Sequence, residues 1–148
     1  MEKEIRVGSQ VLSDNFNSIY VEMPMTVNTY DIDIAGHVNN IVHIRWLEDM
    51  RNALCSHIYD LRKLLDINYY LVVTSSEAKY KKPILLFDKP LGKMFLHSYS
   101  HGLIVLKAEI SVEGQTAFVA TQKCVLMNLS DNKMFYGNIQ NLTTKFKN

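Results

Sequence analysis

The sequence predicts an α+β domain in which a five-stranded antiparallel sheet wraps around one long central helix. This prediction depends on a long segment with helical apolar spacing near the middle of the chain and on strand-like alternation before and after it. The length of 148 residues is that of one domain. We therefore expect residues 1–148 to form a single domain with a core at about 19–130 and loosely packed ends.

The first strand and the loop after it have different patterns. From Ile19 to Val27, apolar residues occupy alternate positions, as in a half-buried strand. Pro24 has no N–H to donate, so it indicates a sheet edge or a bulge. The segment Tyr30 to Asn40 has no period and is rich in Asp, Asn and Gly. We expect it to be a loop.

A helix, or two helices, should run from about Ile41 to Asp66. Apolar residues recur there every three or four positions, at Leu47, Met50, Leu54, Ile58, Leu61 and Leu65. Asn39 or Asn40 can act as the N-cap, because an Asn side chain accepts from unpaired N–H groups of the first turn.

Four further strands are predicted after the helix, at residues 69–80, 92–99, 103–112 and 115–128. Short turns at residues 100–102 and 113–114 indicate that the last three strands form an antiparallel meander. The helix is the one element that can cover the apolar face of this sheet.

Charge and composition exclude several classes of function. The chain has 16 basic and 15 acidic residues, so no global field would draw it onto nucleic acid or an anionic membrane. The N-terminus is charged, and no apolar run is long enough to span a membrane. We expect a cytoplasmic protein whose Cys55 and Cys124 are reduced thiols, with no metal site.

One motif in the loop before the helix carries functional information. The run DIDIAGHVNN at residues 31–40, followed by WLEDMR at residues 46–51, resembles the hotdog-fold thioesterases related to 4-hydroxybenzoyl-CoA thioesterase and to plant acyl carrier protein thioesterases. The predicted order of elements is also that family's order. The resemblance implies a hotdog fold and hydrolysis of an acyl-CoA or acyl carrier protein thioester, as in fatty acid metabolism, with no cofactor.

The resemblance also implies roles for three residues of the motif. Asp33 is the expected catalytic carboxylate, acting as nucleophile on the thioester carbonyl or as general base on a water. The backbone N–H of Asn40 is the expected donor to the developing oxyanion. His37 matches a histidine that helps to orient the site. The family's assisting Asn is replaced by Ala35, so a structural role for His37 stays open.

Two residues of the predicted helix are also candidates for substrate contact, together with Asn39 of the motif. His43 stands where relatives usually have Tyr, and we expect it to line the pocket or the subunit interface. Glu48 forms an E-x-x-R pair with Arg51, a spacing that allows an ion pair. Another branch of hotdog thioesterases has its catalytic carboxylate on this helix, which makes Glu48 the reserve catalytic candidate.

The third candidate group for substrate binding is Tyr80, Lys81 and Lys82, at the end of a predicted strand. The lysines could hold the phosphates of coenzyme A or the acidic surface of a carrier protein. Lysine clusters at strand ends are, however, ordinarily solvated.

Two alternative functions stay open. A hotdog hydratase or dehydratase is disfavoured, because its D-x-N-P-x-H hallmark is absent around Asp33. A non-catalytic hotdog domain that binds acyl-CoA for regulation could dispense with the carboxylate. One exposed sheet edge and the family's shared sites both predict a homodimer, or a homotetramer built from it.

Overall fold

Six strands and three helical elements make up the described part of the chain. The computed structural model describes residues 4–12, 16–57 and 60–137. In chain order the elements are β1 (Arg6–Leu12), β2 (Phe16–Pro24), the 3₁₀ turn η1 (Thr29–Asp31), α1 (Asn40–Ser56), α2 (Leu61–Asp66), β3 (Tyr69–Tyr80), β4 (Leu91–Ser100), β5 (Leu103–Val112) and β6 (Gln115–Asn128).

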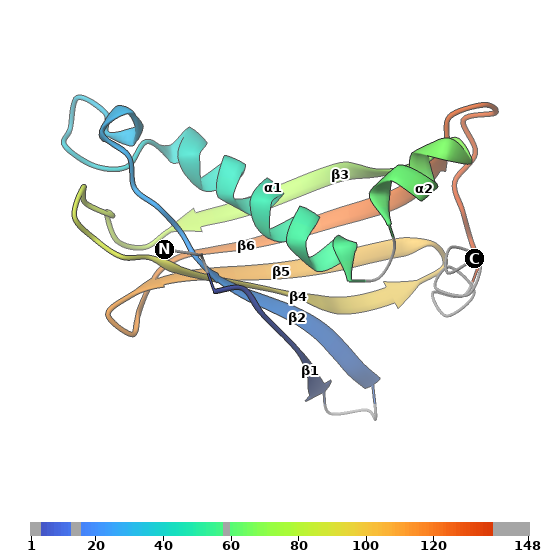
Figure 1. The fold of residues 1–148 in the computed structure, drawn as a ribbon, viewed down its shortest axis with the longest axis horizontal. Coiled ribbons are helices and arrows are strands. Elements are labelled where there is room, and N and C mark those ends of the chain that lie inside the picture. The colour runs from blue at the N-terminus through green and yellow to red at the C-terminus, as the bar shows by residue number, and fades with distance from the viewer. Residues whose placement is uncertain (1–3, 13–15, 58–59, 138–148) are drawn as a thin grey trace.

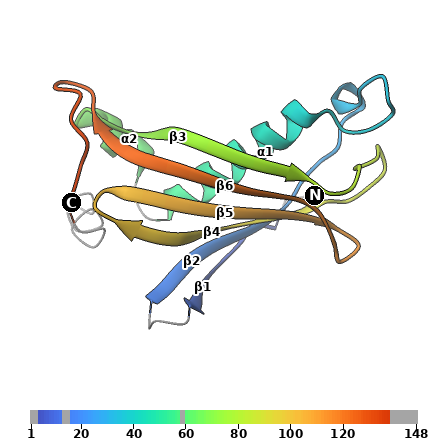
Figure 2. The same ribbon diagram turned by 180° about the vertical axis from the view of Figure 1, so that it is seen from behind.

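The strands form one antiparallel sheet in the order β1-β2-β4-β5-β6-β3. Helix α1 lies across one face of this curved sheet, and the view from behind shows the opposite face without a helix (Figures 1 and 2). Strand β3 is an edge strand although it follows the helices in sequence, and β1 forms the other edge. The edge at β3 presents unpaired backbone groups that a further strand could pair with.

The core lies between α1 and the covered face of the sheet. The helix contributes its apolar stripe of Trp46, Leu47, Met50 and Leu54, all at most 5% exposed. The sheet contributes alternate residues of its central strands, because successive side chains of a strand point to opposite faces. In β5, for example, Leu106, Ala108 and Ile110 are buried under the helix.

The predicted α+β fold is confirmed, with one additional strand. The sequence predicted five strands and loosely packed ends, but residues 6–12 form β1 and pair with β2. At the other end, Phe135 packs against the small buried cluster of Leu64 and Leu126. Residues 138–148 lie outside the described part of the chain.

The predicted helical segment is divided in two. Helix α1 ends at Ser56, and α2 begins after Asp60, whose Oδ1 accepts from the backbone N–H of Arg62 at 2.9 Å. The meander of the last three long strands is confirmed. Pro24 is the last residue of β2 and pairs with Leu91 of β4, whereas the pairing of β2 with β1 ends at Glu22, so Pro24 lies where β2 is paired on one side alone, as the sheet-edge explanation requires.

Both cysteines are free thiols. Burial raises the pKa of Cys124 to about 11, although nearby Arg51 partly opposes this effect. Cys124 is therefore protonated at neutral pH and is a poor nucleophile. None of the helices in the described ranges combines the length and apolar character needed to cross a membrane.

Candidate active site

Asp31, the first aspartate of the motif, holds the loop together. It is 5% exposed, and its Oδ2 accepts hydrogen bonds from the backbone N–H and the side-chain Nδ2 of Asn28, at 2.8 and 3.2 Å. Its carbonyl accepts from the backbone N–H of Asn39 at 2.8 Å. The carboxylate thus holds the start of the loop at Asn28, and the backbone carbonyl joins the two ends of the loop.

Asp33, the second aspartate, lies in the tight turn between those ends. Its backbone N–H donates to the carbonyl of His37 at 2.8 Å, and the N–H of Gly36 donates to its carbonyl at 3.0 Å. Side-chain Oδ1 accepts from the N–H of Ala35 at 2.9 Å and from that of His37 at 3.4 Å. No hydrogen bond to Oδ2 comes from the described residues. One carboxylate oxygen is therefore held in place while the other is available.

The loop is fixed to the connection between β3 and β4 as well as to the helix. Ile32 and Val38 form a bridge across its neck, and the N–H of Val38 donates to the carbonyl of Ile84 at 2.8 Å. Ile84 is fully buried and belongs to the connection between β3 and β4. Figure 1 shows this connection beside the start of α1, at the same end of the molecule as the loop.

The first N–H groups of α1 differ in whether they have a hydrogen-bond acceptor. Asn39 is the N-cap, as predicted, because its Oδ1 accepts from the N–H of Ile41 at 3.0 Å. The N–H of Val42 donates to the Asn39 carbonyl at 2.9 Å. The N–H of Asn40 has no hydrogen-bond partner in the described ranges. It therefore lies at the positive end of the helix with its hydrogen-bonding capacity unused.

Two side chains hold carbonyl groups at the same helix start. The hydroxyl of Tyr80, at the end of β3, donates to the carbonyl of Asn40 at 3.2 Å. His43 Nδ1 lies 3.2 Å from the carbonyl oxygen of Asn39. A carbonyl oxygen only accepts, so Nδ1 carries the proton and donates. The His43 ring also meets the ring of Tyr80 edge-on at 5.0 Å between centroids.

Burial controls the ionisation of both side chains. Desolvation lowers the pKa of His43 below its ordinary value, and the hydrogen bond to Asn39 opposes this only in part. Desolvation raises the pKa of Tyr80. At neutral pH, His43 is therefore a neutral imidazole and Tyr80 a protonated phenol, and both can donate to the helix start.

The structure brings together most of the residues that the sequence singled out. Asp33, His37, Asn39 and Asn40 share the loop and the helix start, and Tyr80 reaches them from β3. The side chain of His37 is exposed and makes no hydrogen bond with the described residues. Backbone N–H groups of Lys81 and Lys82 donate to the carbonyl of Ala117, and Lys82 Nζ donates to Gln115.

The expected ion pair between Glu48 and Arg51 is wrong. None is present in the described residues; Arg51 Nη1 instead donates to Oε1 of Gln122 on β6 at 2.9 Å, and Glu48 is exposed. Gln122 is 4% exposed, and its amide donates in turn to Ser76 Oγ at 3.0 Å. A buried acceptor across the helix–sheet interface competes better for a guanidinium than a solvated carboxylate on the same helix.

Sequence reasoning missed the hydrogen bonds of His43 and Tyr80 to the helix start. The position of His43, four residues after the N-cap, places its side chain near the cap carbonyl and could have indicated the contact. Nothing local could have revealed Tyr80, which is 40 residues away from Asn40 and depends on where β3 lies in the sheet.

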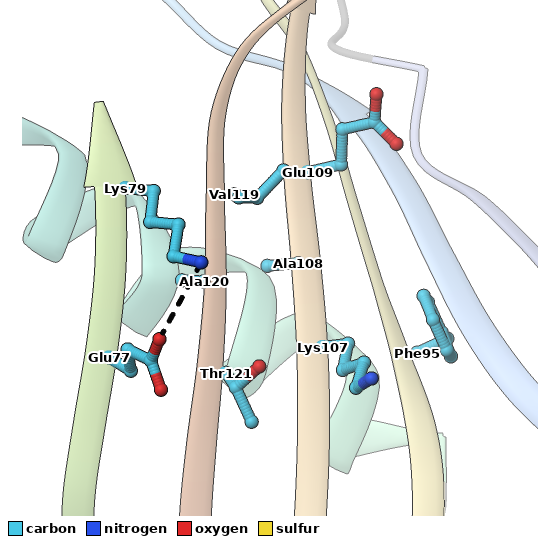
Figure 3. Close-up of a pocket in the computed structure, with 9 residues that line it drawn as sticks. All are labelled: Glu77, Lys79, Phe95, Lys107, Ala108, Glu109, Val119, Ala120 and Thr121. Atoms are coloured by element: carbon cyan, nitrogen blue, oxygen red, sulfur yellow. Dashed lines mark ion pairs between the residues drawn. The ribbon is translucent and has the colours of Figure 1, made fainter. Parts of the chain in front are cut away.

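A cavity of about 300 Å³ lies elsewhere, on the sheet face opposite α1. Figure 3 shows its lining side chains, with the ion pair between Lys79 and Glu77 at one side. That pair spans 3.9 Å and is largely exposed. The remaining lining residues are Phe95, Lys107, Ala108, Glu109, Val119, Ala120 and Thr121. No residue of the loop or of the helix start contributes to this cavity, so it is separate from Asp33.

Large apolar side chains surround the Asp33 loop and are exposed to solvent. Tyr30 and Ile34 in the loop are 81% and 106% exposed, and Phe87 in the connection after β3 is 91% exposed. Ile41 and Ile44 on the first turns of α1 are also exposed. An apolar surface of this kind ordinarily marks a binding site. In the described ranges no cluster of three or more His, Cys, Asp or Glu side chains could hold a metal ion.

Comparison with known proteins identifies the family. The family model described as the Thioesterase-like superfamily matches residues 27–140. No curated protein matches the sequence significantly.

Among solved structures, the DHNA-CoA thioesterase from Staphylococcus aureus has a TM-score of 0.73 and 21% identity, covering 79% of this chain and 80% of that one. The probable thioesterase YbaW from Escherichia coli has a TM-score of 0.74 and 21% identity, covering 86% and 98%. The protein SAV2348 from Staphylococcus aureus, solved in complex with CoA, has a TM-score of 0.75 and 16% identity, covering 84% and 82%. These likenesses show the hotdog fold of this chain.

Proposed function

The chain belongs to the Thioesterase-like superfamily, and we propose that it hydrolyses an acyl thioester to a free acid and a thiol. The observation that carries this proposal is that a carboxylate oxygen of the loop and a backbone N–H at the helix start both lack hydrogen-bond partners among the described residues. Asp33 has an available carboxylate oxygen, and Asn40 has an available N–H at the start of a helix. A carboxylate and an oxyanion donor are the two groups that thioester hydrolysis requires.

In the proposed reaction, the substrate carbonyl oxygen accepts from the N–H of Asn40. Asp33 Oδ2 then attacks the carbonyl carbon, the C–S bond breaks, and the thiolate leaves with the bonding electron pair. Water hydrolyses the resulting mixed anhydride, which restores the carboxylate. Alternatively, Asp33 takes a proton from a water that attacks the carbonyl directly, and the proton passes to the leaving thiolate. In both routes Asn40 stabilises the same oxyanion.

The proposed thiol carrier is coenzyme A. Two similar structures, a DHNA-CoA thioesterase and a protein in complex with CoA, support this class of substrate. Lys81 and Lys82 directly follow Tyr80, whose hydroxyl donates to the carbonyl of Asn40 at the helix start. These two lysines are the proposed contacts for the CoA phosphates. An acyl carrier protein with its acidic surface is the alternative carrier.

The proposed active form is a homodimer. Strand β3 is an unpaired sheet edge, and it ends at Tyr80, beside the helix start. The exposed side chains of Ile34, Ile41 and Phe87 surround the proposed site and would be covered by a partner. Pairing two chains at this edge would enclose the proposed site around Asp33 with residues of both subunits.

Incubation of the purified protein with acyl-CoAs of differing chain type, together with a thiol reagent, tests the activity directly. We expect thiol release that saturates with substrate concentration. Calorimetry with the same acyl-CoAs measures binding, and it therefore distinguishes hydrolysis from binding without hydrolysis. Saturable binding without thiol release would contradict the proposal and identify a regulatory acyl-CoA-binding domain instead.

A further inference from the structure

The peptide group between Asn39 and Asn40 joins two features of the site. Its N–H is that of Asn40, which has no partner in the described part of the chain. Its carbonyl is that of Asn39, which accepts from the backbone N–H of Val42 at 2.9 Å and from the side-chain Nδ1 of His43 at 3.2 Å. A trans peptide is planar, and its N–H and C=O point in opposite directions. Whatever fixes the carbonyl therefore also fixes the direction of the N–H.

His43 is well placed to fix this peptide group. Its side chain is 3% exposed, and aromatic rings surround it on three sides. The ring centroids of Trp46, Tyr80 and Phe118 lie 5.4, 5.0 and 5.0 Å from that of His43. The imidazole thus has little freedom to rotate, and it holds the Asn39 carbonyl from the buried side. The N–H of Asn40, on the opposite side of this peptide group, is consequently directed away from His43.

We propose that His43 is a positioning residue for catalysis, because it orients and polarises the peptide group whose N–H stabilises the oxyanion. This inference rests on the proposed function. A hydrogen bond accepted by a peptide carbonyl increases the donor strength of the N–H in the same peptide, since hydrogen bonds in a chain polarise one another. Tyr80 supports the arrangement by donating to the carbonyl of the next peptide group, that of Asn40.

The effect should be on the chemical step. An interaction that strengthens in the transition state raises kcat, whereas one that is equal in both states changes KM. Loss of a complete oxyanion donor lowers kcat by about 10²–10³-fold. Loss of the group that orients the donor should therefore lower kcat by roughly tenfold to a hundredfold, with a much smaller change in KM.

Two substitutions at one position separate the hydrogen bond from the packing. His43→Phe keeps an aromatic ring but removes the donor. His43→Asn removes the ring but keeps a donor nitrogen at the same number of bonds from Cα as Nδ1. We expect kcat to fall in His43→Phe and to recover at least in part in His43→Asn. A folded His43→Phe protein with the kcat of the unmodified protein would overturn the proposal, as would equal losses in both variants.

A second readout follows the contact without relying on activity. The amide ¹⁵N resonance of Asn40 should respond to the hydrogen bond on the Asn39 carbonyl, because both belong to one peptide group. We expect it to shift in His43→Phe and to return toward its original position in His43→Asn.

The combined results distinguish the two proposals. A shifted Asn40 resonance with unchanged kcat would overturn the role of His43 but leave thioester hydrolysis standing. Failure of the unmodified protein to release thiol from any thioester would overturn the proposed function, and the catalytic role of His43 with it, even if the resonance still shifts. Loss of kcat together with the shift, recovered in His43→Asn, would support both.

Discussion

Arg51 on α1 donates to the buried Gln122 on β6, and this hydrogen bond of 2.9 Å joins the helix to the strand next to the edge strand β3. The side-chain amide of Gln122 donates in turn to Ser76 Oγ of β3. The helix that begins at the proposed site is thus linked, by polar groups, to the edge strand that also reaches this site.

Arg51→Leu should destabilise the fold. The substitution leaves the Gln122 carbonyl buried without its donor, which costs about 1–3 kcal/mol in free energy of unfolding. Urea denaturation measures this difference. Arg45→Leu, at an exposed position of the same helix, is the control and should change stability by less than about 0.5 kcal/mol. Equal effects of the two substitutions would show that the bond to Gln122 contributes nothing.

Asp33→Asn should abolish thioester hydrolysis while substrate binding persists. The substitution removes the attacking or water-activating oxygen at nearly constant volume, and such groups contribute roughly 10²–10⁴-fold. Steady-state thiol release should therefore fall at least about a hundredfold. Glu48→Gln is the matched control on an exposed carboxylate. If Glu48→Gln proves the more damaging change in folded protein, the carboxylate of the helix is the catalyst.

Asp31→Ala should damage stability in addition to activity, unlike a change at Asp33. Its carboxylate accepts two hydrogen bonds from Asn28, and hydrogen bonds to charged groups contribute about 1.5–3 kcal/mol each. Thermal unfolding should reveal a lower melting temperature. Asp31→Asn keeps an acceptor and should be milder. An Asp31→Ala protein as stable as the unmodified one would mean that the loop is held by its backbone hydrogen bonds alone.

The stability of the protein should decline as the pH falls below about 6.5, and His43 should cause part of this decline. Because burial lowers its pKa in the folded state, the unfolded chain takes up a proton that folded His43 does not. The free energy of unfolding therefore decreases as the pH falls through the unfolded pKa and levels off below the folded one. Tyr80, the titratable group in ring contact with His43, is neutral throughout this range.

Denaturation of His43→Phe at a series of pH values isolates this contribution. The other four of the five histidines are exposed and are common to both proteins. Between about pH 7 and pH 5, the variant should lose stability less steeply. Identical slopes in the two proteins would show that His43 is accessible to protons in the folded state.

Dilution should reduce activity if the proposed dimer is required. Light scattering at a series of concentrations gives the assembly state, and thiol release measured on the same samples gives the activity. We expect both to fall together as dimers dissociate. A stable and fully active monomer of 17.1 kDa would refute a site shared between subunits.

The sequence predicted the elements better than their contacts. The spacing of apolar residues, together with turn and cap residues, identified the helix start at Asn39 and the long strands after it, because these signals come from neighbouring positions in the sequence. Strand β1 was missed because residues 6–12 show no strong alternation, and their pairing with β2 stabilises them instead.

In the candidate site, too, the sequence predicted what is close along the chain but not the contacts between distant residues. The motif placed Asp33 and Asn40 together, since they lie in one loop and its helix. The contacts of Tyr80 with Asn40 and of Arg51 with Gln122 join residues 40 and 71 positions apart. Long-range contacts of this kind depend on strand order, which local patterns do not determine.

The hydrogen bond from Val38 to Ile84 couples the Asp33 loop to the connection between β3 and β4. Both partners contribute backbone atoms, so the coupling does not depend on which side chains occupy these positions. Substitutions of exposed residues in the connection should therefore leave the loop in place, whereas insertions or deletions between β3 and β4 should displace it. Over evolutionary time, the length of that connection should be more constrained than the identity of its exposed residues.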